Sequence, residues 1–108
     1  MTFKEYQEAA ERTARKVPAA ERFTNFGMGL AGETGEVIDY LKKVCFHEHP
    51  LDTTKLAEEL GDVLWYVATL ATTAGLDLDQ IAEQNIAKLR ARYPNGFDVE
   101  RSRNRLRW

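Results

Sequence analysis

An internal duplication constrains the fold of this chain more than any other feature of its sequence. Residues 30–41 align without gaps to residues 56–67, and six of the twelve aligned positions are identical. Both segments have the apolar spacing of an amphipathic helix, and a short connection separates them. Two helices joined in this way lie antiparallel, so the repeat predicts a helix pair related by an approximate two-fold axis.

The rest of the chain also has helical periodicity, in stretches divided by Pro18, Pro50 and Pro94. We therefore expect an all-α fold, a four-helix bundle built on the antiparallel central pair. The predicted helices span residues 2–16, 20–46, 53–74 and about 77–92, with Gly75 capping the third helix and with Ile81, Ile86 and Leu89 on the inner side of the fourth. The predicted domain covers residues 1–98, followed by an irregular arginine-rich tail over 99–108.

Bulk properties narrow the possible partners and the compartment. The net charge of -2 provides no field for duplex nucleic acid or an anionic membrane, and no apolar run approaches the ~20 residues of a membrane span. Cys45 is the single cysteine, which fits a cytoplasmic protein. Arginines alternate at the end of the chain, where we expect either a solvated tail or subunit contact, or a phosphate contact: Arg101, Arg103, Arg105 and Arg107.

Two pairs of acids recur in the duplicated segments. Glu33 and Glu36 are about 60° apart on a helical wheel and border the apolar stripe, and Glu59 and Asp62 repeat this arrangement. Acids at this spacing usually form a solvated helix face. Here both pairs lie beside the apolar stripes of the two duplicated helices, so we expect the four carboxylates to face one another where these helices pack. Four crowded carboxylates need protons or a cation, and their oxygens favour Mg²⁺, with Mn²⁺ as a substitute. A di-iron site is not expected, because neither helix has Glu-x-x-His.

The acids and their surroundings resemble the MazG-like all-alpha nucleoside triphosphate pyrophosphohydrolases. The resemblance rests on residues 29–37, 49–52, 58–66 and 85–94. It implies hydrolysis of a nucleoside triphosphate to the monophosphate and pyrophosphate, with the four acids as magnesium ligands. It also implies a homodimer or a homotetramer.

Further residues are candidates for the site. The resemblance implies substrate binding by three residues of the last helix, Asn85, Lys88 and Arg92, which share one stripe. From its position beside Glu59, Glu58 is a candidate second ligand or base, with surface solvation as the alternative. Asn25 is a candidate for contact with the nucleotide base. Lys43 is a candidate for offsetting the acidic charge or for binding phosphate.

Two other classes of function remain open from the sequence. One is a non-catalytic helical module that binds nucleotides or proteins, although such a module has no need for four crowded carboxylates. The other is a metal-dependent phosphatase that releases orthophosphate. The identity of the products distinguishes these classes from a pyrophosphohydrolase.

Overall fold

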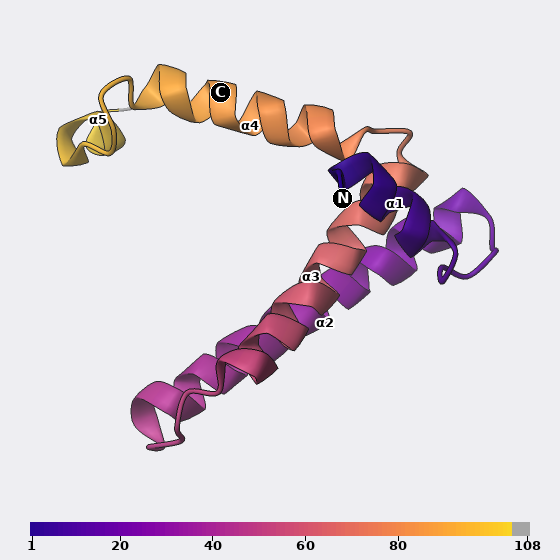
Figure 1. Ribbon diagram of the computed structural model, residues 1–108, viewed down its shortest axis with the longest axis horizontal. Helices are drawn as coiled ribbons and strands as arrows, with labels where there is room; N and C mark the ends of the chain where they lie inside the picture. Colours follow the sequence, from indigo (N-terminus) through magenta and orange to yellow (C-terminus); the bar gives the residue numbers. More distant parts are fainter. Residues whose placement is uncertain (105–108) are drawn as a thin grey trace.

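The computed structural model describes residues 1–104, and helices account for most of this part of the chain. The helices are α1 (Phe3–Glu11), α2 (Ala19–Phe46), α3 (Thr53–Thr73), α4 (Leu78–Arg92) and α5 (Val99–Arg103). The long helices α2 and α3 lie side by side and antiparallel, and they form the most extensive helix contact (Figure 1). The predicted all-α fold with an antiparallel central pair is therefore confirmed.

Helix α1 packs across the carboxyl-terminal half of α3, where the small core of the chain forms. Ala10, Ala68 and Leu78 make up this buried cluster, one residue from each of three helices. The side-chain amide of Gln7 forms hydrogen bonds to the backbone between α3 and α4. Its Nε2 donates to the Leu76 carbonyl at 3.0 Å, and its Oε1 accepts from the Leu78 amide at 2.8 Å. Because Gln7 is buried, these bonds fix the turn between α3 and α4 against α1.

Helix α1 is shorter than predicted, because it ends at Glu11 and not near residue 16. The backbone amides of residues 12–14 bond three residues back, which tightens and closes the helix. The Thr13 hydroxyl donates to the Ala10 carbonyl and accepts from Trp65 Nε1 at 2.9 Å. The tertiary contact with α3 thus helps to set where α1 stops.

The turn from α3 to α4 follows the predicted chemistry. Gly75 has a φ of 72°, the left-handed conformation that suits glycine, and Asp77 caps α4 through the amide of Asp79. Helix α4 contacts α1 and α3 near its start and then projects away from the central pair (Figure 1). Ile86 and Leu89 are consequently 46% and 37% exposed, so their predicted inward placement is wrong for the single chain.

The segment predicted as irregular contains the short helix α5. Asp98 caps it by accepting from the amide of Glu100 at 2.9 Å, and Arg101 Nε donates to the carbonyl of Arg92. This prediction was wrong because the Asp98 side chain caps the free amides of a further helical turn. The predicted tail residues Arg105 and Arg107 lie outside the described residues, as does the rest of 105–108.

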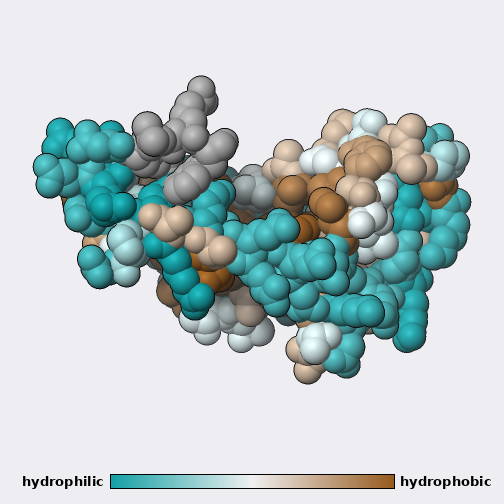
Figure 2. All heavy atoms as spheres, turned by 90° about the horizontal axis from the view of Figure 1, so that it is seen from above, coloured by the Kyte–Doolittle hydropathy of each residue, from teal (hydrophilic) through white to brown (hydrophobic). Residues whose placement is uncertain are grey.

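Large apolar side chains are exposed on several helices. Ile38 is 61% exposed on α2, and Leu60 and Leu64 are 51% and 36% exposed on α3. Figure 2 shows hydrophobic atoms at the surface among hydrophilic ones. The radius of gyration is 16.9 Å, whereas a compact domain of this length has about 13 Å. None of the helices described here is both long and apolar enough to span a bilayer.

Candidate metal centre

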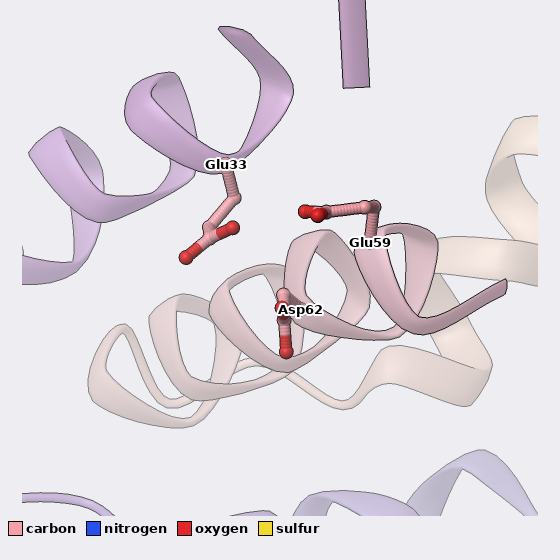
Figure 3. Close-up of side chains that lie close together, drawn as sticks. All are labelled: Glu33, Glu59 and Asp62. Atoms are coloured by element: carbon pink, nitrogen blue, oxygen red, sulfur yellow. The ribbon is translucent and has the colours of Figure 1, made fainter. Parts of the chain in front are cut away.

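Three of the predicted acids come together across the seam between α2 and α3. Glu33 extends from α2 and faces Glu59 and Asp62 on α3 (Figure 3). One carboxylate oxygen from each of the three residues lies within 4.8 Å of the other two. Glu33 and Glu59 are half-buried, and Asp62 is exposed. The spacing fits several oxygens around one cation, at the position that the helical wheels predict.

The electrostatics of this cluster are unfavourable without a counter-charge. Burial is the largest of the effects that raise the pKa of Glu33 above its ordinary value. The negative charges of nearby acids raise this pKa further: Glu36, Asp62 and Glu59. Burial, followed by the charge of Glu36, likewise raises the pKa of Glu59. The exposed Glu36 is therefore near enough to both carboxylates to act on them, although it lies outside the tight group of three.

Two oxygens of the cluster lack partners. Glu33 Oε2 and Glu59 Oε2 are buried, and neither has a hydrogen-bond partner. A buried carboxylate oxygen without a donor is costly and needs either a proton or a cation. Because the available donors are all carboxylate oxygens, the residues fit a hard divalent ion such as Mg²⁺.

Lys55 is a cation beside this cluster that the sequence analysis missed. Its Nζ lies 4.9 Å from the centroid of the Tyr40 ring. Its positive charge lowers the pKa of Glu59, although burial and the neighbouring acids raise that pKa by more. Lys55 stands one helical turn before Glu59, so their i,i+4 spacing was a usable signal. The structure thus places one positive charge at the edge of the acidic seam.

The aromatic residues near the acids pack the helices together. The hydroxyl of Tyr40 accepts from the backbone amide of Asp52 at 2.7 Å and so holds the loop before α3. Tyr66 packs edge-on against Trp65 and close to Phe26, with ring centroids 5.0 and 6.2 Å away. These contacts give the aromatic side chains a structural role in the seam.

Other candidate residues lie apart from the three clustered carboxylates. Glu58 is exposed on α3, one residue before Glu59. Lys43 Nζ lies 3.0 Å from Asp39 Oδ2, so it forms an ion pair with an acid outside the cluster. Asn25 lines a surface cleft of about 590 Å³ near the start of α2.

Three further candidates are on α4, which leaves the central pair (Figure 1). Asn85 and Lys88 are exposed, and Arg92 is partly buried with its guanidinium 6.0 Å from the ring centroid of Tyr93. The structure keeps these residues on one side of one helix but does not bring α4 of the same chain to the acids.

Comparison with known proteins identifies the family to which the chain belongs. Residues 22–97 match the MazG nucleotide pyrophosphohydrolase domain, a segment that contains the acids and the whole of α4 but leaves out α1. The Gene 37 protein of Mycobacterium phage L5 is 36% identical over 100 residues, with 84% of this chain and 88% of the phage protein covered. No solved structure matches the chain. The chain belongs to the MazG nucleotide pyrophosphohydrolase family.

Proposed function

We propose that this chain hydrolyses nucleoside triphosphates between the α and β phosphates, giving a monophosphate and pyrophosphate, at a magnesium site formed by Glu33, Glu36, Glu59 and Asp62. The observation that carries the proposal is the pair of buried, unpartnered oxygens on Glu33 and Glu59 beside a third carboxylate. Membership of the family supports the reaction.

The acids have distinct parts in this proposal. When bound, the divalent ion would neutralise phosphate charge and lower the pKa of a water molecule. Glu33, Glu59 and Asp62 would hold the ion from both helices, and Glu36 would add a fourth carboxylate from the exposed edge. We assign to Glu58, the exposed acid next to Glu59 in the sequence, the role of the base that accepts a proton from an attacking water.

Substrate phosphates require positive charge and hydrogen-bond donors. Lys55 is the cation beside the acids in the same chain, and we assign it to phosphate binding. Lys88 and Arg92 would bind further phosphate oxygens, with Asn85 supplying an amide. Lys43 is in an ion pair with Asp39, so we assign it to balancing acidic charge and not to substrate.

We assign the nucleotide base to the surface near Asn25, which lies about two helical turns before Glu33. The cleft beside Asn25 also contains Arg15 and Met28, and the first of these comes from the α1–α2 connection, outside the matched domain. This end of α2 therefore offers both an apolar contact and polar groups to a base.

We further propose that the working form is a homodimer or a homotetramer. Ile38 and Leu64 occupy matched positions of the repeat, and both are exposed. They point about 160° away from the seam tyrosines Tyr40 and Tyr66, so the central pair has a second apolar face for a partner.

We also propose that the protein works in the cytoplasm. The exposed thiol of Cys45 is consistent with a reducing compartment of this kind.

The test is incubation with a panel of ribo- and deoxyribonucleoside triphosphates and Mg²⁺, with the products separated by anion-exchange chromatography. We expect monophosphate and pyrophosphate from the wild type and no products from Glu36→Gln. Glu8→Gln is the matched control, because Glu8 is an exposed acid on α1. Diphosphate with orthophosphate would establish a phosphatase instead. No turnover with either Mg²⁺ or Mn²⁺ would establish a non-catalytic module.

A further inference from the structure

The cleft beside Asn25 is built mainly by residues that the family match does not include. It has a volume of about 590 Å³, and four of the seven residues that line it come before residue 22, where the match begins. Arg15 and Val17 come from the connection between α1 and α2, and Glu21 comes from the first turn of α2. This wall of the cleft therefore lies outside the matched domain.

The connection that carries Arg15 is held in place by contacts on both sides. Ala14 is buried next to it, and the Thr13 hydroxyl accepts a hydrogen bond from α3 at 2.9 Å. The ion pair of Arg22 with Glu11 joins α2 to the end of α1 across the connection. Because these contacts restrict the backbone, the wall of the cleft is preformed and a ligand does not have to order it.

Glu21, Asn25 and Met28 form the α2 side of the cleft. Their i, i+4 and i+7 spacing places them on one stripe of the helix. Asn25 points within about 20° of Glu36 on the helical wheel, and it lies ~12 Å before Glu33 along the helix axis. A nucleoside triphosphate has a similar length between its base and its α and β phosphates. A nucleotide with these phosphates at the acids would therefore place its base at this stripe.

Arg15 and Glu21 bring opposite charges to the cleft without neutralising each other. Both side chains are exposed, and within residues 1–104 neither takes part in a side-chain ion pair. The cleft thus offers a ligand a fork of N–H donors and a pair of acceptor oxygens. Met28 and Val17 add apolar surface, which suits the flat face of an aromatic ring.

Guanine is the nucleotide base whose edges match both charges. Its N1–H and N2–H₂ groups are adjacent donors, so one carboxylate can accept from both. Its O6 and N7 atoms are adjacent acceptors, which an arginine fork binds through two parallel hydrogen bonds. Adenine and cytosine instead have a donor next to an acceptor on the pairing edge, and uracil and thymine have one donor between two carbonyl oxygens. Each of these bases would leave a carboxylate oxygen facing an acceptor, which is unfavourable.

We propose that this cleft selects guanine nucleotides, with the Glu21 carboxylate accepting from N1–H and N2–H₂ and with the Arg15 guanidinium donating to O6 and N7. The proposal rests on the proposed function for the position of the phosphates, and it adds the class of substrate. Because both residues come before the matched domain, membership of the family does not imply this preference.

The first experiment measures kcat/KM with Mg²⁺ for the ribo- and deoxyribonucleoside triphosphates of each base. We expect guanine nucleotides to exceed the others by about tenfold or more, because a contact of two hydrogen bonds gives discrimination of that order. Inosine triphosphate lacks the N2 amino group and 7-deazaguanosine triphosphate lacks N7, so each should lose part of the advantage. Similar values for all bases, or a preference for another base, would overturn the proposal and leave the proposed function intact.

The second experiment tests the two residues. Glu21→Gln replaces two acceptors with one acceptor and one donor, which match N6–H₂ and N1 of adenine, so we expect the preference to move from guanine towards adenine. Arg15→Met should lower kcat/KM for GTP by more than for 7-deazaguanosine triphosphate. Glu8→Gln and Arg12→Met are the matched controls, since both change exposed residues outside the cleft, and both should keep the guanine preference. A preference that is unchanged in either cleft variant would overturn the proposal.

A binding measurement separates this proposal from the proposed function. If the wild type hydrolyses nothing, it is titrated by calorimetry with the α,β-methylene analogues of GTP and ATP in the presence of Mg²⁺. About tenfold tighter binding of the guanine analogue, lost in Glu21→Gln, would support the cleft even though the hydrolytic function had failed. Equal dissociation constants for the two analogues, or no binding of either, would overturn guanine selection.

Discussion

The ring of Tyr66 lies against the backbone of Gly29, where an added Cβ would stand 2.8 Å from the phenolic oxygen and closer still to the ring carbons. Matched positions of the internal repeat are twenty-six residues apart, so the counterpart of Tyr66 is Tyr40. Gly29 stands one residue before the first repeat, and Lys55 stands one residue before the second. Tyr40 and Lys55 also meet, with the Lys55 ammonium 4.9 Å from the ring centroid of Tyr40. Each of the two tyrosines thus contacts the partner helix at the position one residue before the other repeat.

Replacing Gly29 with alanine should disrupt this seam. Because the new methyl group would overlap the Tyr66 ring, we expect Gly29→Ala to lower the free energy of unfolding by roughly 1–3 kcal/mol. Gly32→Ala is the matched control, since a Cβ at Gly32 meets nothing within 4 Å. That variant should be neutral or more stable by up to ~1 kcal/mol. Urea unfolding measures both, and equal midpoints for the two variants would contradict the close packing.

Gln7 should stabilise the junction of α1, α3 and α4 through its amide. Gln7→Leu leaves the Leu78 amide and the Leu76 carbonyl without their partner. We expect a loss of about 2–3 kcal/mol in unfolding free energy, because buried polar groups become unsatisfied. Gln80→Leu changes an exposed glutamine on α4 and should alter stability little. A Gln7→Leu protein as stable as this control would show that the bonds contribute nothing.

The ion pair of Glu11 and Arg22 should make the free energy of unfolding depend on pH in the acidic range. Arg22 nitrogens lie 2.5 and 2.6 Å from the Glu11 carboxylate oxygens, and these bonds lower the pKa of Glu11. The stabilisation is therefore present above the ordinary pKa of 4.5 and is lost as the pH falls through the lower pKa of the folded state. We expect Glu11→Gln to cost about 1 kcal/mol at neutral pH. The deficit relative to the wild type should shrink in strong acid, and a constant deficit across the titration would refute this.

Magnesium should stabilise the folded chain through the acidic seam. A ligand at one hundred times its dissociation constant adds about 2.7 kcal/mol to the unfolding free energy. We expect thermal unfolding of the wild type to shift upward with Mg²⁺ and the shift to disappear in Glu33→Gln. The variant should keep its metal-free stability, because the glutamine removes a crowded charge. Glu8→Gln should retain the magnesium shift, and a shift of equal size in Glu33→Gln would show that magnesium does not act through the seam.

Lys55 should affect metal and substrate in opposite directions. Lys55→Met removes a positive charge beside Glu59, so Mg²⁺ should bind more tightly while the Michaelis constant for the nucleotide rises. Calorimetry measures the first effect and steady-state kinetics the second. Lys42→Met, which removes an exposed lysine paired with Asp39, serves as the control. If metal and nucleotide both bind normally to Lys55→Met, Lys55 has no part in the site.

The sequence by itself determined the helical elements and the positions of the acids. Proline spacing, the cap at Asp77 and the glycine at Gly75 act within a few residues, so they have the same effect in almost any tertiary setting. The periodicity of a helix likewise fixes that Glu33 and Glu59 border apolar stripes. Because the two duplicated apolar stripes pack against each other, the proximity of the Glu33 and Glu59 carboxylates could be predicted from the sequence pattern alone.

Only the tertiary structure decided how the remaining helices lie. Ile86 and Leu89 have the spacing of a buried helix face, but this spacing does not specify which surface covers the face. The exposure of both side chains in the single chain could therefore not be predicted from the sequence. The early end of α1 depends on a bond between Thr13 and Trp65, fifty-two residues apart. Contacts of this kind join residues distant in sequence, and their geometry exists only after the helices have packed.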